Sequence, residues 1–219
     1  MSLRFRSVVF DCDSTLVRIE GIDELAGAHR ADVQRLTDLA MDGQMPLEEV
    51  YGERLRIIRP TRAQVEAIGD SYIDALVDDA RETVAELLHL GVDVRVISGG
   101  LLPPVLAVAR ELGIPADRVA AVGIEFHADG EYSHFDNASP LARSGGKREV
   151  VSGWGLPRPS LMVGDGMTDL EARPAVDAFA AFMGVVNRPV IAAAADHVIS
   201  SSSLRSVVDL VRGPSSTSE

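Results

Sequence analysis

Three short apolar runs, each ending in small or acidic polar residues, constrain the fold of this chain more than any other feature. The runs cover residues 7–10, 92–97 and 160–163 and contain mainly β-branched, aliphatic and aromatic side chains. Continuous apolar runs of this length are typical of strands buried on both faces of a sheet. Weaker runs of the same kind predict further strands at 119–122, 178–182 and 197–200.

Helical patterns alternate with these strands. Residues 81–90 and 102–112 carry apolar side chains at helical spacing, and a glycine follows each segment as a stop signal. Further helices are predicted over residues 146–154, 167–173, 189–195 and 204–211. Strands that alternate with helices predict an α/β fold, in which helices cover both faces of a parallel sheet.

Two stretches break this alternation. Residues 17–78 have helical periodicity and no convincing strand, so we expect a helical insertion between a core of residues 1–16 and 79–212. Residues 124–135 alternate in polarity around Asp129-Gly130, which is a strong signal for a small β-hairpin. The small polar residues of 213–219 predict a disordered tail.

Charge and cysteine content limit the partners and the compartment. The 219 residues carry a formal net charge of −12, which argues against nucleic-acid and anionic-membrane partners. A single cysteine, Cys12, excludes an intrachain disulfide, and the N-terminus lacks the apolar segment of a signal peptide. These features predict a cytoplasmic protein and leave a monomer and a homodimer equally open.

The polar residues that end the three main strands are predicted to meet. Asp11 and Asp13 follow the first strand, Ser98-Gly99-Gly100 follow the second, and Asp165 follows the third. In an open parallel sheet, ligands bind outside the carboxyl ends of the strands. We therefore expect these groups to gather at one edge of the sheet.

Two close carboxylates repel each other unless a cation or a shared proton relieves them. A few carboxylates with several waters are the usual protein ligands of Mg²⁺, and a neighbouring carboxylate could then attack phosphorus. Any one of these aspartates taken alone is better explained as a turn former or helix cap. Three motifs on successive strand ends favour chemistry instead.

Other polar residues are ambiguous on their own. Ser98-Gly99-Gly100 offers a hydroxyl and backbone N–H groups that could cradle a phosphate. Lys147 stands at a predicted helix start, where an anionic ligand or simple solvent exposure would explain it equally well. Taken alone, Glu20, Arg54, Asp23 and Glu24 are interpreted as exposed helix residues.

The motifs together resemble those of the haloacid dehalogenase-like superfamily. The matching positions are 10–16 (FDCDSTL), Ser98, Lys147 and 164–169 (GDGMTD). Within that superfamily the chain is most similar to the phosphoserine phosphatases. This likeness is carried by residues 11–26, 40–43 with Arg54, 97–100, 130–136, 144–147 and 164–172.

The resemblance implies a Rossmann-like core with residues 17–78 as a helical cap that selects the substrate. It also implies a Mg²⁺-dependent hydrolase of O-phospho-L-serine, in serine biosynthesis, that passes through an aspartyl phosphate. Asp11 is implied as the nucleophile. Asp13 is implied as the acid that protonates the leaving oxygen and then as the base that activates water.

The resemblance also assigns the ligands. Mg²⁺ is implied to bind Asp11, the backbone carbonyl of Asp13, and Asp165, with Thr15 and Asp169 in support. Ser98, Gly99, Gly100 and Lys147 are implied to hold the phosphoryl group. In the cap, Glu20 would meet the substrate ammonium and Arg54 its carboxylate, with Thr168 near the substrate.

The identity of the substrate stays open at this stage. Leu47 and Leu101 stand where the resemblance implies aromatic residues of the pocket wall. A phosphatase with the same mechanism acting on phosphohomoserine or phosphothreonine is therefore the first alternative. The others are a phosphoryl transferase and an inactive relative that only binds a phosphorylated ligand.

Overall fold

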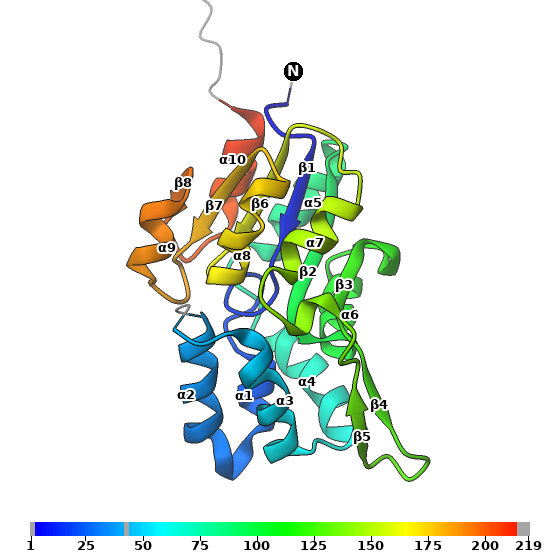
Figure 1. Ribbon diagram of the computed structural model, residues 1–219. Coiled ribbons are helices and arrows are strands. Elements are labelled where there is room, and N and C mark those ends of the chain that lie inside the picture. The colour runs from blue at the N-terminus through cyan, green and yellow to red at the C-terminus, as the bar shows by residue number, and fades with distance from the viewer. Residues whose placement is uncertain (1–2, 42–43, 214–219) are drawn as a thin grey trace, which may run out of the picture.

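A six-stranded parallel sheet forms the centre of the molecule (Figure 1). The computed structural model describes residues 3–41 and 44–213. The strand order is β3-β2-β1-β6-β7-β8. These strands are β1 (Ser7–Phe10), β2 (Asp93–Leu101), β3 (Val119–Val122), β6 (Ser160–Gly164), β7 (Ala178–Phe182) and β8 (His197–Ile199). All six lie where the apolar runs predicted strands, and the predicted α/β class is confirmed.

Helices cover both faces of this sheet because its central strands are buried on both sides. Val8 and Phe10 point into one core and Val9 into the other, and none of the three is exposed to solvent. The first core packs against α5 (Ala80–His89), α6 (Leu102–Glu111) and α10 (Arg205–Arg212). The second packs against α7 (Gly146–Gly153), α8 (Met167–Glu171) and α9 (Pro189–Ala194).

The register of the sheet brings the ends of three strands to one edge. Phe10 lies beside Val96 of β2 on one side and Val163 of β6 on the other. The second strand is longer than the predicted 92–97, because Leu101 still pairs with Val122 of β3 after a register shift. Ser98-Gly99-Gly100 is therefore extended backbone within β2, immediately before α6.

Residues 17–78 contribute helices, as the sequence predicts, and these lie together beyond the carboxyl end of the sheet (Figure 1). They are α1 (Gly21–Leu25), a 3₁₀ turn (Gly27–His29), α2 (Arg30–Met41), α3 (Leu47–Ile58) and α4 (Arg62–Asp74). The chain enters and leaves this helical segment at one place, where Val17 bridges Leu76 and the Val77 amide donates to the Leu16 carbonyl.

The predicted hairpin consists of β4 (Ile124–Phe126) and β5 (Tyr132–Phe135), which pair antiparallel. Its turn contains Gly130 with a positive φ of 87°, a conformation that glycine adopts readily. The hairpin lies beside the helical segment. The Arg62 amide donates to the Gly130 carbonyl at 2.9 Å, and the rings of Tyr51 and Phe135 are 5.2 Å apart.

The remaining predictions differ only at their ends. The other predicted helices are present with ends within two residues, and α8 stops early because a 3₁₀ turn, Arg173–Ala175, follows it. Further 3₁₀ turns cover Ala116–Arg118 and Pro140–Ala142. Residues 214–219 of the predicted tail, and Asp42 and Gly43, lie outside the described residues. No helix in the described part of the chain is long and apolar enough to span a membrane.

A capping box starts α4. The Gln64 amide donates to Thr61 Oγ1 at 3.3 Å, and the Thr61 amide donates to Gln64 Oε1 at 2.8 Å. We expect Thr61→Ala to lower the free energy of unfolding by about 1 kcal/mol, the usual loss for a Thr cap. Urea unfolding measures this change. The control is Ser71→Ala, an exposed hydroxyl on the same helix, which should change stability by less than about 0.5 kcal/mol; equal losses would contradict the prediction.

Candidate active site

A cavity opens at the sheet edge, between the strand ends and the helical segment. Thirteen residues line it: Asp11, Asp13, Glu20, Ile22, Arg54, Ser98, Gly99, Gly100, Leu141, Arg143, Lys147, Asp165 and Thr168. All the predicted site residues except Thr15 and Asp169 are in this set. Those two lie behind it, since Thr15 donates to Asp165 at 3.4 Å and Asp169 pairs with Lys147.

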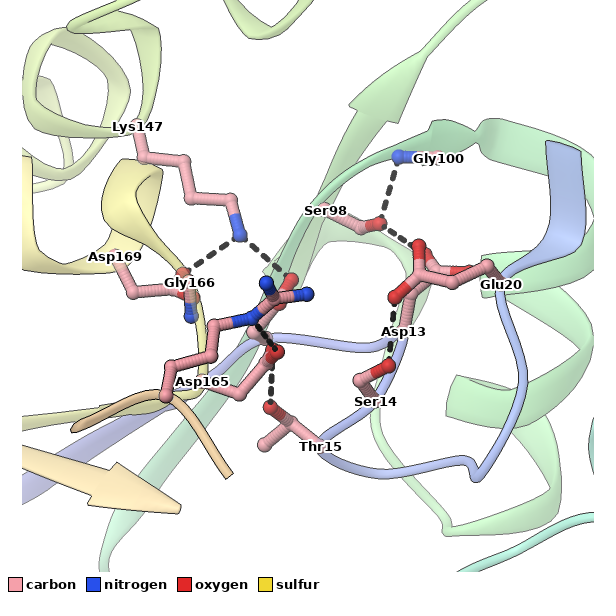
Figure 2. Close-up of polar contacts among 12 residues, drawn as sticks. Asp13, Ser14, Thr15, Glu20, Ser98, Gly100, Lys147, Asp165, Gly166 and Asp169 are labelled. Carbon is pink, nitrogen blue, oxygen red and sulfur yellow. Dashed lines mark hydrogen bonds and ion pairs between the residues drawn. The ribbon is translucent and has the colours of Figure 1, made fainter. Parts of the chain in front are cut away.

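Three buried carboxylates gather on one side of the cavity. Oxygens of Asp11, Asp165 and Asp169 all lie within 4.8 Å of one another. The Lys147 ammonium lies 2.6 Å from Asp11 Oδ1 and 2.6 Å from Asp169 Oδ1. Figure 2 shows the Lys147 side chain reaching toward Asp169. Arg188 donates from Nε to Asp165 Oδ2 at 3.3 Å.

The packing of two glycines explains why Lys147 is buried. A Cβ atom on Gly146 would lie 1.7 Å from the Pro140 carbonyl oxygen, so only glycine lets the start of α7 approach the 3₁₀ turn this closely. The residue before it, Gly145, has a positive φ of 72°. Lys147 is consequently only 5% exposed, which rules out solvent exposure as the explanation for its position. It is also the only lysine in the sequence.

Burial and mutual repulsion make these carboxylates costly to ionise. Burial and then the charge of Asp169 raise the pKa of Asp11 well above its usual range. The same two causes, in the same order, raise the pKa of Asp165 to about 6. Burial alone would lower the pKa of the Lys147 ammonium, but Asp11 and Asp169 together raise it. Lys147 therefore remains charged.

This carboxylate cluster suits a hard divalent cation. The three carboxylates carry three negative charges, and Lys147 and Arg188 supply two positive charges against them. Burial and then the charge of Asp169 raise the pKa values of Asp11 and Asp165, and an added cation would lower them. Oxygen donors alone are the preferred ligands of Mg²⁺ and Ca²⁺.

The Asp13 carboxylate is not part of the acidic cluster and faces a different set of groups. Ser98 Oγ donates to Asp13 Oδ2 at 2.9 Å, and the Gly21 amide donates to Oδ1 at 2.9 Å. The Tyr72 hydroxyl also donates to Oδ1. Figure 2 shows Asp13 and Ser98 across the site from Lys147 and Asp169. Two aspartates two residues apart thus have separate surroundings.

Two ionisable side chains from residues 17–78 complete the cavity, Glu20 and Arg54. Ser14 donates to Glu20 Oε1 at 2.6 Å, while burial, followed by the charge of Asp13, raises the pKa of Glu20 to about 8. Arg54 is only 3% exposed and donates from Nη1 to Thr37 Oγ1 at 2.9 Å. Its buried Nε has no hydrogen-bond partner among the described residues.

The interpretation of Arg54 and Asp23 as exposed helix residues is therefore wrong. Thr37 links them, because its hydroxyl accepts from Arg54 and donates to Asp23 Oδ1 at 2.6 Å. All three side chains are buried. Periodicity along a single helix could not reveal this, since the partners come from α1, α2 and α3.

Sequence reasoning missed several residues of the site, among them four polar side chains. Tyr72, Thr37 and Arg188 contact predicted site residues, and Arg143 lines the cavity. Tyr72, Thr37 and Arg188 belong to segments without a polar motif, so the sequence carried no local signal for them. The aromatic position implied at Leu101 is a buried leucine, and the side chain of Leu47 is not described.

The chain is similar to known hydrolases along most of its length. Residues 5–177 match the haloacid dehalogenase-like hydrolase family. The human phosphoserine phosphatase is 42% identical over 191 residues, which cover 83% of each chain. The chloroplastic phosphoserine phosphatase of Arabidopsis thaliana is 40% identical over 201 residues, covering 88% of this chain and 68% of that one.

The fold agrees with solved structures of the same kind. A phospho-aspartyl intermediate analogue of phosphoserine phosphatase superposes with a TM-score of 0.83 at 25% identity, over 95% of this chain and 99% of that one. The chain belongs to the haloacid dehalogenase-like hydrolase family. It is an enzyme of that family, and the predicted resemblance to the phosphoserine phosphatases is confirmed.

The Lys147 ion pairs give a stability prediction for the protein in a chelator. Lys147→Met should lower the free energy of unfolding at pH 7.5 by about 3 kcal/mol or more, because it leaves buried carboxylates unpaired. The loss should be smaller at pH 5. Removing the lysine raises the pKa values of the carboxyl groups in the folded protein further. A carboxyl group with a raised pKa destabilises the folded protein at pH values above its pKa in the unfolded chain. This destabilisation becomes smaller as the pH falls through its pKa in the folded protein.

Urea unfolding at both pH values measures this difference. The control is Arg148→Met, which removes the same charge from an exposed position on the same helix. It should change stability by less than about 0.5 kcal/mol at either pH. A loss for Lys147→Met that did not depend on pH would show that the carboxylates are not the cause.

Proposed function

We propose that this protein is a Mg²⁺-dependent phosphomonoesterase that hydrolyses O-phospho-L-serine to L-serine and phosphate. The observation that carries the proposal is the cavity itself. It joins a buried carboxylate cluster at the strand ends to Arg54, whose Nε is buried without a partner. One end suits a phosphate beside a cation, and the other suits a carboxylate.

In the proposed reaction, an oxygen of Asp11 forms a bond to phosphorus while the bond from phosphorus to the serine oxygen breaks. The electron pair stays on that oxygen, which takes a proton from Asp13. Water then attacks the aspartyl phosphate and gives its proton to Asp13, and the bond between phosphorus and Asp11 breaks. The separate surroundings of Asp11 and Asp13 support these different roles, since only Asp13 lies outside the acidic cluster.

Mg²⁺ would be held by Asp11, the Asp13 backbone carbonyl and Asp165, and would neutralise charge on carboxylate and phosphate. Thr15 and Asp169 would hold Asp165 and Lys147 in place, as their contacts suggest. Ser98, Gly99, Gly100 and Lys147 would bind the phosphoryl oxygens. Gly99 and Gly100 suit this task because they leave backbone close to the cavity.

The helical segment would act as the cap that selects the substrate, with Glu20 facing the ammonium, Arg54 the carboxylate and Thr168 nearby. The buried Asp23–Thr37 pair supports this assignment, because it fixes one edge of the Arg54 guanidinium and leaves Nε for a ligand. We place the boundaries of this cap at residues 17–78. A role in serine biosynthesis and a cytoplasmic location belong to the same proposal.

Metal binding should be visible as thermal stabilisation. We expect saturating Mg²⁺ to raise the unfolding midpoint of the wild type by about 5 °C, since binding at about 100 times Kd contributes about 2.7 kcal/mol. Asp165→Asn should lose most of this shift because it removes a ligand. The control is Asp117→Asn, an exposed carboxylate far from the cavity, which should keep it. An undiminished shift in Asp165→Asn would contradict the metal assignment.

Substrate selection should depend on Arg54. For Arg54→Lys we expect KM for phosphoserine to rise roughly 100-fold, because the variant loses the planar fork that binds a carboxylate. KM for phosphoethanolamine, which has no carboxylate, should change less than about threefold. Steady-state phosphate release measures both, with Asp11→Asn as the variant that should not turn over. An equal increase in KM for both substrates would show that Arg54 does not recognise the substrate carboxylate.

A panel with phosphothreonine, phosphohomoserine and p-nitrophenyl phosphate tests the substrate itself. Phosphoserine should have the highest kcat/KM. If kcat/KM for phosphoserine were no higher than for p-nitrophenyl phosphate, the substrate assignment would be wrong, while the assignment as a phosphatase would remain supported. Absence of turnover on every member with Mg²⁺ present would favour an inactive ligand-binding relative.

A further inference from the structure

The two carboxylate oxygens of Asp13 have partners from different parts of the molecule, one from the cap segment and the other from the central sheet. Oδ1 accepts hydrogen bonds from the Tyr72 hydroxyl of α4 and from the Gly21 amide of α1. Oδ2 accepts from Ser98 of β2. A Cβ atom on Gly100 would lie 2.7 Å from Oδ2, so this oxygen also sits close against the strand backbone that lines the cavity.

The approach of Tyr72 to Asp13 depends on a second feature of the cap. Tyr72 lies on the last turn of α4, is only 1% exposed, and has its ring in the same apolar core as Ile68 and Leu76. Its hydroxyl would lie 2.2 Å from a Cβ atom on Gly21, so glycine at position 21 is what lets the phenol reach Asp13. Burial, followed by the charge of Asp13, raises the pKa of Tyr72, which keeps the phenol a hydrogen-bond donor.

We propose that Tyr72 is a positioning residue for the proton transfer that Asp13 performs. The inference rests on the proposed function, because it assigns Tyr72 a part in the first step of that reaction. Tyr72 does not line the cavity, so it acts on the substrate only through Asp13.

The contact favours one direction of proton movement. When Asp13 gives its proton to the leaving oxygen it becomes a carboxylate, and a hydrogen bond from a neutral donor is stronger to a carboxylate than to a carboxylic acid. The phenol therefore stabilises the charge that forms on Asp13 as the phosphorus–oxygen bond breaks. Because the phenol holds Oδ1 of Asp13, the other oxygen, Oδ2, points toward Ser98 and the cavity.

This role predicts a dependence on the leaving group. A basic alkoxide must be protonated as it departs, whereas p-nitrophenolate leaves without a proton. The variant Tyr72→Phe should therefore lower kcat/KM for phosphoserine and phosphoethanolamine roughly 10- to 100-fold, the value of a hydrogen bond to a charged group. It should lower kcat/KM for p-nitrophenyl phosphate less than about threefold, with phenyl phosphate in between.

The measured quantity is the ratio of kcat/KM values within one preparation, so any loss of folded protein cancels. It also separates this inference from the substrate assignment, because the two aryl phosphates have no amino-acid end. A wild type that did not prefer phosphoserine would defeat that assignment and leave the leaving-group trend intact.

The control is Tyr51→Phe, which removes a buried hydroxyl that has no hydrogen-bond partner among the described residues. Its kcat/KM should follow the wild type across the whole series. If Tyr72→Phe lowered kcat/KM for all substrates by the same factor, Tyr72 would be only a structural contact between the cap and the core. No loss for the alkyl phosphates would equally overturn the proposal.

Discussion

The ion pairs of Lys147 with Asp11 and Asp169 are the interaction on which the rest of the site depends. They are buried at the carboxyl end of the sheet, where ionised carboxylates are stable only if positive charge lies beside them. The tight start of α7, made possible by Gly146, delivers that charge. Asp11 and Asp169 can lie this close together because the Lys147 ammonium pairs with both of them.

Asp11 and Asp13 are only two residues apart, but their side chains lie among different groups and are suited to different chemistry. Asp11 lies among like charges next to an ammonium, whereas Asp13 lies among neutral donors from β2, α1 and α4. The first arrangement suits a nucleophile beside a cation, and the second suits a group that exchanges protons. The helical segment therefore contributes directly to the site, since Gly21 and Tyr72 supply two of the donors to Asp13.

The helical segment also lines the cavity with one basic and one acidic side chain, Arg54 and Glu20. Arg54 is held by Thr37, which in turn is held by Asp23, so the guanidinium is fixed before any ligand arrives. Glu20 lies directly before α1, where Ser14 donates a hydrogen bond to it. Two polar groups that are held in place before binding lose little conformational freedom when a ligand binds.

The sequence by itself determined the sheet, the helical insertion, the hairpin and the strand-end motifs. These features follow from local patterns: runs of apolar residues, helical periodicity, and Asp-Gly at a turn. The ends of the predicted strands already indicated Asp11, Asp13, Asp165 and Ser98-Gly99-Gly100 as site residues. The resemblance to a known family added Glu20, Arg54, Lys147 and Thr168, which also line the cavity. Only the tertiary structure decided that Lys147, Arg54 and Asp23 are buried, and that Tyr72, Thr37 and Arg188 contact the site. Burial and pairing of a charged side chain depend on partners far away in the sequence, so no local pattern encodes them.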